Sequence, residues 1–279
     1  MNYRASLNVS RIAIYIVLSI VLLLCIVPIW LVLVNSTRST AEIQSGITLI
    51  PSSHLIANWK NLSGRGFSVG RGLFNSLLIA VSGSAVTVYF SLLTAYALEI
   101  YNFKLKNFIY VLVLILIMIP MQISIIGYYK YMSILHMLDN YLPLILPGIA
   151  APASIFFAKQ YLESCVIKEL IEAARIDGYG ELAIFNRVML PIAAPGAFTM
   201  AIFAFVASWN NFMTPFMLLS QTRLYTLPML VKTLRGDVYR TEYGSIYLGL
   251  AISIIPVIIV YILFSKYIVS GIAMGAVKE

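Results

Sequence analysis

The stretch at 12–34 reads IAIYIVLSIVLLLCIVPIWLVLV and carries no charged residue over 23 positions. A helix of about 20 residues crosses a hydrocarbon core of about 30 Å, so this stretch predicts a membrane span. Arg4 and Arg11 precede it, as they would in a secretory signal peptide. The run is longer than the roughly 7–15 apolar residues of a signal peptide, however, and no small-residue cleavage pattern closes it. We therefore expect an anchor that stays in the chain.

Five further apolar stretches predict spans at about 73–98, 107–129, 142–163, 195–220 and 244–270. They are far longer than the roughly 10-residue alternating strands of outer-membrane barrels, which favours helices. The fourth is long enough only if it includes Lys159, whose ammonium group can reach the membrane surface along its apolar stem. The chain is 61% hydrophobic and 11% charged, against roughly 25% charged residues in soluble domains. The expected fold class is an all-α polytopic membrane protein with six transmembrane helices, in one domain over residues 1–279.

The basic residues between the predicted spans do not orient the chain. With both termini on one side, that side would hold ten Lys and Arg residues and the other side nine. Cytoplasmic loops of membrane proteins usually carry a clear excess of these residues. Ten against nine leaves both orientations open.

Several kinds of chemistry are disfavoured by what the sequence lacks. The chain contains no Gly-Lys pair, so it has no phosphate-binding loop of the G-x-x-x-x-G-K-[ST] type. The only histidines, His54 and His136, lie far apart and form no metal-ligand or triad pattern. The predicted spans hold ionisable residues only near their ends, whereas ion-coupled carriers need such groups inside the membrane. A secondary carrier is therefore the weaker alternative, and we expect no cofactor or metal bound by this chain.

A few residues inside the predicted spans could contact a polar solute, namely Asn75, Gln122, Trp209, Asn210 and Asn211. One interpretation is that their polar groups hydrogen-bond neighbouring helices or backbone. The other is that they line a path for a hydroxyl-rich solute, because the flat face of Trp209 suits a sugar ring. The sequence leaves both interpretations open, and we take these residues as candidates for a translocation path.

The most charged stretch, at about 164–191, has a different pattern. One face of a predicted helix at 167–177 is formed by residues at i, i+3, i+4 and i+7: Leu170, Ala173, Ala174 and Asp177. Gly178 stands where a left-handed residue would end that helix. A second short helix, expected to stop at Pro191, has these residues on one side: Leu182, Phe185, Val188 and Met189. We predict a helix-turn-helix outside the membrane; an amphipathic helix resting on lipid headgroups is the alternative.

Within this stretch, Glu172-Ala173-Ala174, the glycine four residues beyond, and Leu190-Pro191 resemble the cytoplasmic coupling loop of importer permeases of the ATP-binding-cassette (ABC) class. The fuller string EAARIDG at 172–178 is similar to the carbohydrate, maltose-like branch of these binding-protein-dependent inner-membrane components. Shorter similarities follow along nearly the whole chain: Asn75-Ser76-Leu77, Ala95-Tyr96-Ala97, Trp209-Asn210-Asn211-Phe212, Thr226-Leu227-Pro228 and Gly275-Ala276-Val277-Lys278. The chain departs from the family pattern at Ile167 and Tyr179, where Pro and Ala are common, and we expect altered packing there.

The resemblance implies a coupling site and a set of partners. The residues expected to couple this chain to an ATPase are Glu172, Ala173, Ala174, Arg175, Asp177, Gly178, Leu190 and Pro191. The implied partners are a sister permease in a heterodimer, two ATPase subunits, an extracytoplasmic sugar-binding protein, a sugar and membrane lipid, with no nucleic acid. ATP and Mg would be bound by the ATPase subunits, so this chain would not itself be an enzyme. The loop at 164–191 and both termini would be cytoplasmic, in the plasma (inner) membrane of a bacterium or archaeon.

The resemblance also gives a role to the last outer loop, at 221–242. In this family that loop can reach the solute-binding protein, and the residues that could do so here are Arg223, Tyr225, Lys232, Arg235, Tyr239 and Arg240. Ordinary solvated charge is the alternative. The expected function is uptake of a sugar or oligosaccharide. The alternatives are an importer of the same class for a sugar acid, a polyol or glycerol phosphate, and, more remotely, a secondary carrier.

Overall fold

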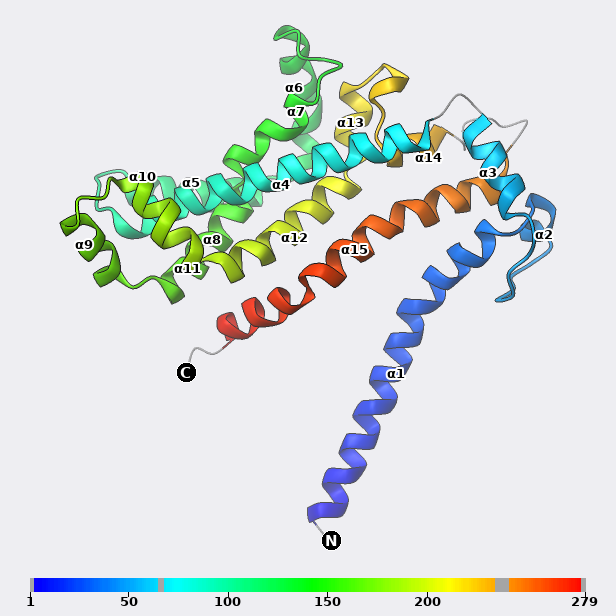
Figure 1. The fold of residues 1–279 in the computed structure, drawn as a ribbon, viewed down its shortest axis with the longest axis horizontal. Coiled ribbons are helices and arrows are strands. Elements are labelled where there is room, and N and C mark those ends of the chain that lie inside the picture. The colour runs from blue at the N-terminus through cyan, green and yellow to red at the C-terminus, as the bar shows by residue number, and fades with distance from the viewer. Residues whose placement is uncertain (1–2, 65–67, 234–240, 277–279) are drawn as a thin grey trace. The chain divides into compact units, whose positions relative to one another are not determined.

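The computed structural model describes the backbone of residues 3–64, 68–233 and 241–276, and the side chains of residues 11–64, 68–120, 123–233 and 241–265. This part of the chain consists of helices and the turns and loops between them (Figure 1), as the sequence predicts. Contacts between residues divide the chain into two units, Met1–Val69 with Leu230–Ile254 and Gly70–Met229 with Ile255–Glu279. The expectation of a single domain over residues 1–279 stays a prediction.

The first unit holds α1 (Tyr3–Ser36), α2 (Thr40–Gln44), α3 (Leu55–Gly64) and the beginning of α15 (Tyr243–Ala276). None of the residues in the most apolar part of α1, within Arg11–Ser36, is buried. Because α1 is this apolar and this exposed, its side chains are suited to contact with lipid or with another membrane-embedded surface. The predicted span at 12–34 therefore lies on a continuous helix.

Buried hydrogen bonds hold α3 to the segments around it. The Asn58 side-chain amide donates to the carbonyl oxygens of Ser36 at 2.8 Å and Arg38 at 2.9 Å. The Ser245 hydroxyl, on α15, donates to the Asn58 carbonyl oxygen at 3.2 Å. A Cβ atom at Gly244 would lie only 2.3 Å from the Arg38 carbonyl oxygen, so α15 begins in direct backbone contact with this loop.

The second unit is built on α4 (Val69–Ile100), α8 (Pro152–Cys165) and α12 (Ala194–Asn210). Leu92 and Ala95 of α4 pack with Ala158 and Leu162 of α8 in one buried apolar cluster. A Cβ atom at Gly196 would lie 2.5 Å from the ring of Tyr161, so α12 passes α8 without room for a side chain. This close packing makes α4, α8 and α12 the frame that carries the functional segments.

Three helices are each long and apolar enough to cross a membrane: Arg11–Ser36, Val69–Ile100 and Tyr243–Ser265. Three bent pairs reach that length only when taken together: Lys106–Met118 with Ile123–Ile134, Leu142–Ala150 with Pro152–Cys165, and Glu181–Ile192 with Ala194–Asn210. If each pair counts as one span, the described residues hold six, the number predicted.

The third predicted span, at 107–129, is not one straight helix. The helices α5 (Lys106–Met118) and α6 (Met121–Ile134) meet at 107° around Pro120. Pro120 has no N–H to donate, and Ile119 before it is extended, with φ −80° and ψ 118°, because the proline ring disfavours a helical residue there. The fourth span bends by 40° for the same reason, at Ala151 before Pro152, between α7 (Leu142–Ile145) with η1 (Leu146–Ala150) and α8.

The fifth predicted span, at 195–220, is not one continuous helix. Helix α12 stops at Asn210, Asn211 is extended with φ −69° and ψ 108°, and a separate helix, α13 (Met213–Leu218), follows. The Asn211 side-chain oxygen accepts a hydrogen bond from the Thr214 N–H at 3.2 Å, which satisfies a donor of the new helix's first turn. The sequence Asn210-Asn211 therefore marks a break in the span.

Candidate functional site

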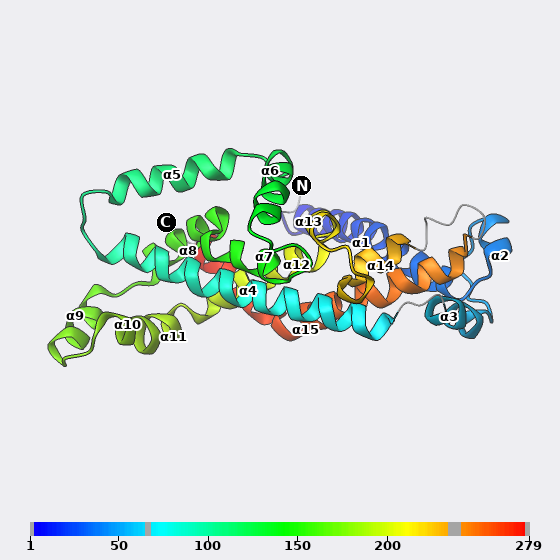
Figure 2. The same cartoon turned by 90° about the horizontal axis from the view of Figure 1, so that it is seen from above.

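The predicted helix-turn-helix is present next to the C-terminal end of α4 (Figure 1), and Figure 2 shows the same neighbourhood from above. It comprises α9 (Lys168–Ile176), α10 (Glu181–Ile184), a π-helical turn, η2 (Phe185–Met189), and α11 (Leu190–Ile192). We call residues 168–192 the hairpin. Its second arm meets α12 at 84°, so the hairpin runs across the direction of the span that follows it.

Gly178 ends α9 in the left-handed conformation that the sequence predicts, with φ +82°. Its N–H donates to the Arg175 carbonyl oxygen at 3.0 Å, and the Tyr179 N–H donates to the Ala174 carbonyl oxygen at 3.1 Å. This pair of bonds is the Schellman pattern of helix C-termini. A Cβ atom at Gly178 would meet nothing within 4 Å, so the backbone conformation, and not lack of space, is what favours glycine.

The predicted faces of the hairpin helices need correction. The buried residues of α9 are Ile171 and Ala174, which pack with Ile184 and Phe185 in the core of the second unit. Leu170 and Ala173, predicted to share a face with Ala174, are exposed. The buried face of α9 is formed by Ile171 and Ala174, three positions apart, so it is displaced from the predicted face. On the second arm Leu182 is 65% exposed, and Ile184 takes the buried place predicted for it.

The exposed side of the hairpin therefore presents acidic and apolar groups together. Glu172, Ala173 and Asp177 are exposed, and they are accompanied by exposed Leu170 and by Ile176, which is 86% exposed. Large apolar side chains that remain uncovered on a charged helix are typical of a surface that contacts another protein. Of the two alanines expected to contact an ATPase, only Ala173 lies on this side.

Arg175 is directed back into its own chain. Its Nε donates to Oε1 of Glu181 at 2.8 Å, and its Nη2 donates to Oε2 at 3.4 Å. The Arg175 hydrogen bond is the main reason that the pKa of Glu181 lies below its usual range. The guanidinium group thus has an intramolecular partner, and its expected contact with the ATPase stays a prediction. Sequence reasoning did not single out Glu181, although its place in the first turn of α10 is typical of a helix-starting acid.

Leu190 and Pro191 follow a widened turn. The Leu190 N–H donates to the carbonyl oxygen of Phe185, five residues earlier, because the segment Phe185–Met189 is π-helical. A proline removes one N–H from a helix and crowds the carbonyl four residues before it, and a π-turn relieves that crowding. The helix consequently continues through Pro191 to Ile192 and breaks at Ala193, which corrects the predicted stop at Pro191.

At the other end of α4, Asn75 organises the segment that follows α13. Its side-chain amide donates to the carbonyl oxygens of Arg223 and Tyr225, each at 3.0 Å. The neighbouring Ser76 hydroxyl accepts from the Leu227 N–H, at the start of α14 (Leu227–Thr233), at 2.8 Å. Both amide protons of Asn75 are used in this way, in agreement with the hydrogen-bonding interpretation, and a place for Asn75 on a solute path stays a prediction.

A second anchor of this segment escaped sequence reasoning. Asp139, with φ +54°, accepts hydrogen bonds from the Ser220 N–H at 2.6 Å, the Ser220 hydroxyl at 2.7 Å and the Gln221 N–H at 3.1 Å. The Ser220 hydroxyl is the largest of the influences that lower the pKa of Asp139 to about 2. These bonds join the turn after α6 to residues 81 and 82 positions away. No local spacing in the sequence signals such a contact.

The two anchored regions lie at opposite ends of α4. Tyr96, whose hydroxyl donates to Glu181 of the hairpin, follows Asn75 by 21 residues on the same helix. At 1.5 Å per residue this is a rise of about 32 Å. The hydrocarbon core of a bilayer is about 30 Å thick. The hairpin and the segment after α13 are therefore separated along α4 by about one membrane thickness.

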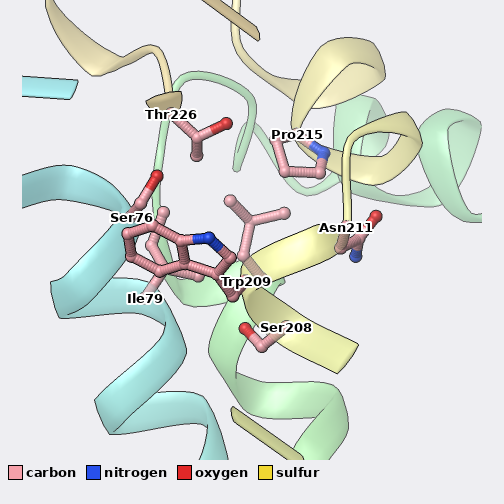
Figure 3. Close-up of a pocket in the computed structure, with 8 residues that line it drawn as sticks. Ser76, Ile79, Ser208, Trp209, Asn211, Pro215 and Thr226 are labelled. Atoms are coloured by element: carbon pink, nitrogen blue, oxygen red, sulfur yellow. The ribbon is translucent and has the colours of Figure 1, made fainter. Parts of the chain in front are cut away.

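Trp209 is buried within this chain, and its place on a solute path stays a prediction. It is 3% exposed and stacks on Phe205 with ring centroids 5.8 Å apart. Figure 3 shows Trp209 beside Ser76 on α4, at a small cavity of about 10 Å³ that Thr226 also lines. That volume is about the space for one water molecule. The buried hydroxyl of Thr226 has no hydrogen-bond partner, so it is a polar group that such a water could satisfy.

A larger cavity of about 200 Å³ lies where the broken third, fourth and fifth spans come together. Its lining residues are Ser124, Ile125, Tyr128, Pro143, Leu144, Pro147, Asn211 and Thr214. Asn211 is thus the path candidate that borders the larger cavity, while Asn210 is exposed at the end of α12. The side chain of Gln122 lies outside the described residues.

The predicted contact residues of the last outer loop are only partly described. Arg223 is exposed and donates to the Gln221 side chain at 2.8 Å, and the Tyr225 hydroxyl donates to the Ser220 carbonyl oxygen at 3.2 Å. Lys232 is exposed in the last turn of α14. Arg235, Tyr239 and Arg240 lie outside the described residues.

The model of one family, described as "Binding-protein-dependent transport system inner membrane component", matches residues 87–274. The chain therefore belongs to this family, and the resemblance predicted from the sequence is confirmed.

Two curated relatives match over nearly their whole length. The arabinooligosaccharides transport system permease protein AraQ of Bacillus subtilis (strain 168) is 33% identical over 281 residues, covering 100% of this chain and 99% of the relative. The trehalose/maltose transport system permease protein MalG of Thermococcus litoralis (strain ATCC 51850 / DSM 5473 / JCM 8560 / NS-C) is 32% identical, covering 92% of each chain. Both are transport permeases, in agreement with the class predicted from the sequence.

A solved structure shares the fold. The crystal structure of a bacterial ABC transporter involved in the import of the acidic polysaccharide alginate matches with a TM-score of 0.81 and 24% identity, covering 96% of this chain and 99% of that chain. At this level of identity the likeness concerns the fold alone. It agrees with the all-α polytopic class predicted from the sequence.

Proposed function

We propose that this chain is the permease subunit of an ABC importer that moves a sugar or oligosaccharide into the cytoplasm. The observation that carries the proposal is the hairpin, a capped and exposed helix pair held at one end of α4. The names of the two curated relatives refer to arabinooligosaccharides and to trehalose/maltose, which supports an oligosaccharide as the solute.

In this proposal the exposed side of the hairpin binds a separate ATPase subunit. Glu172 pairs with a basic residue in a cleft of that subunit, while Ala173 allows a close approach between the two backbones. Leu170 and Ile176, whose side chains are uncovered in this chain, supply the apolar part of the contact. Asp177 and Gly178 shape the end of α9, and Leu190 and Pro191 shape the second arm. ATP and Mg belong to the ATPase subunits, and this chain acts as the channel-forming partner.

The proposed orientation places the hairpin and both termini in the cytoplasm. The segment anchored by Asn75 and Asp139 then faces outward, about one membrane thickness away along α4. There it would meet the extracytoplasmic binding protein that delivers the sugar, through residues that include Arg223, Tyr225 and Lys232. Arg235, Tyr239 and Arg240 are proposed for the same contact.

The solute path is proposed to run past the larger cavity, between this chain and a sister permease. Hydroxyl and amide groups of Ser124, Asn211 and Thr214 line that cavity together with apolar side chains. Such a mixture of apolar surface with a few polar groups is typical of small-molecule sites. Asn211 is the path candidate that this cavity supports, with Asn210 and Gln122 as further candidates.

The test is uptake by the assembled transporter. The chain is co-produced with its sister permease, ATPase and binding protein, and the complex is reconstituted in vesicles loaded with ATP. Labelled arabinooligosaccharides and maltooligosaccharides are supplied outside with the binding protein, and accumulation is measured. Uptake should require both ATP and the binding protein. Uptake that persists without ATP, driven by an ion gradient, would instead indicate a secondary carrier.

A further inference from the structure

One carboxylate joins both arms of the hairpin to the end of α4. Glu181, the first residue of α10, accepts hydrogen bonds from Arg175 at 2.8 Å and 3.4 Å, from the Tyr96 hydroxyl at 3.2 Å and from the Tyr101 hydroxyl. Arg175 lies in the last turn of α9, Tyr96 lies on α4, and Tyr101 directly follows α4. The Arg175 guanidinium also lies over the Tyr101 ring, 5.7 Å from its centroid. Three separate segments therefore meet at Glu181.

The other contacts of the hairpin with α4 are mainly apolar. Ile171, Ala174 and Phe185 pack into the buried cluster that α4 shares. Apolar packing has no preferred direction, so it resists separation of the surfaces more than sliding or rotation. One further hydrogen bond, from the Tyr89 hydroxyl to the Asn186 side chain at 3.3 Å, joins two neutral groups. Directional, charge-assisted bonds to α4 are therefore supplied by Glu181.

The turn between the two arms has few packing contacts. A Cβ atom at Gly178 or at Gly180 would meet nothing within 4 Å, and the Arg187 guanidinium lies over the Tyr179 ring, 5.8 Å from its centroid. The pair formed by Arg175 and Glu181 spans it and ties the end of α9 to the beginning of α10. Without this pair, a force on α9 could be absorbed by a change in the turn.

We propose that Glu181 is a positioning residue of the coupling mechanism, an inference that rests on the proposed function. Its carboxylate fixes the direction of α9, which carries Glu172 and Ala173, relative to the end of α4. A displacement of α9 by the ATPase then moves α4 with it. When the carboxylate is lost, ATP hydrolysis continues with less movement of the span, and less sugar is imported for each ATP.

The experiment uses the complete complex in vesicles, with its sister permease, ATPase subunits and binding protein. Glu181→Gln keeps the size of the side chain but removes the charge that its three donor residues share. We expect the sugar imported per ATP hydrolysed to fall about tenfold, since losing one charge-assisted hydrogen bond changes an equilibrium by about this factor. Glu181→Asp keeps the charge and should recover a large part of the ratio.

Glu163→Gln is the matched control. The Glu163 and Glu181 side chains are equally exposed, at 44%, and each forms an ion pair. Glu163 pairs with Lys159 at 3.3 Å within α8, so its loss does not disconnect the hairpin from α4. This variant should keep the wild-type ratio of sugar to ATP and the wild-type yield of assembled complex.

Tyr101→Phe keeps the proposal testable even where Glu181→Gln fails to assemble, because it removes only one hydroxyl group. It should lower the same ratio by about two- to tenfold, because one hydrogen bond to the carboxylate is lost while those from Arg175 and Tyr96 remain. A wild-type ratio in Tyr101→Phe or in an assembled Glu181→Gln complex, or an equal loss in Glu163→Gln, would overturn the proposal. A wild-type complex without ATP-dependent uptake would overturn the proposed function instead, so the two failures are distinguishable.

Discussion

Replacing Gly178 by valine tests whether the end of α9 matters for transport. The native turn holds Gly178 at φ +82° with hydrogen bonds to the carbonyl oxygens of Arg175 and, from Tyr179, of Ala174. If valine keeps the turn, the left-handed backbone costs about 1–2 kcal/mol. If it abandons the turn, two hydrogen bonds of about 1 kcal/mol each are lost. Either route costs about 1–2 kcal/mol, which lowers the equilibrium ratio of the native hairpin to its alternative conformations about 5–30-fold.

The chain offers controls for this substitution. Gly180 has an ordinary φ of −71° and equally open surroundings, so Gly180→Ala should be harmless. Gly178→Asn should be milder than Gly178→Val, because asparagine tolerates the left-handed conformation. The assay is uptake of labelled oligosaccharide by cells that contain all partners, normalised to the amount of protein in the membrane. Gly178→Val should import several-fold more slowly than Gly180→Ala at equal amounts of protein. Equal rates in these two variants would refute the assignment of the hairpin as the coupling element.

Other perturbations test the partner contact, the orientation and the outer anchor. Glu172→Lys should abolish uptake without removing the chain from the membrane, since it would place a positive charge against a basic cleft; wild-type uptake would contradict the contact. Cysteines at the exposed positions Ser53 and Thr233 should react with an impermeant maleimide outside intact cells, and one at Ser164 should not, whereas the reverse pattern would invert the orientation. Asp139→Ala should lower the melting temperature of the purified protein at pH 7, because the Ser220 hydroxyl and backbone bonds hold the pKa of Asp139 at about 2. Because the folded pKa lies below the ordinary value of about 4, this stabilisation is present above pH 4 and is lost as the pH falls toward 2. Identical melting curves of the wild type and Asp139→Ala at pH 7 would argue against it.

Long apolar helices could be predicted from the sequence, but their breaks could not all be predicted. An uncharged stretch of about 20 residues indicates a segment long enough to cross a membrane, and the described residues include three such helices and three bent pairs that reach this length together. Whether a proline bends such a stretch depends on its surroundings. Pro120 lies between two helices at 107°, whereas Pro28 and Pro256 lie inside continuous helices. The sequence pattern does not separate these cases.

Within the hairpin, features that depend on neighbouring residues could be predicted from the sequence, whereas contacts with residues distant in the chain could not. Gly178 could be assigned from the helix that precedes it, because a C-terminal cap is a property of neighbouring residues. The choice between Ala173 and Ala174 for the buried face depends on where α4 and η2 lie, and this is not encoded in the spacing along α9. Glu181 was missed for the same reason, since Tyr96 and Tyr101 reach it from 85 and 80 positions away.

Helix α4 is secured near both ends, by Asn75 to the segment that follows α13 and by Tyr96 to the hairpin. Its 32 residues form one unbroken helix, which resists bending far more than the loops at either end. If α4 pivots near its middle as a rigid helix, its two ends move in opposite directions. A displacement of the end near the hairpin would then move the end near Asn75 the opposite way, without a series of side-chain rearrangements between them.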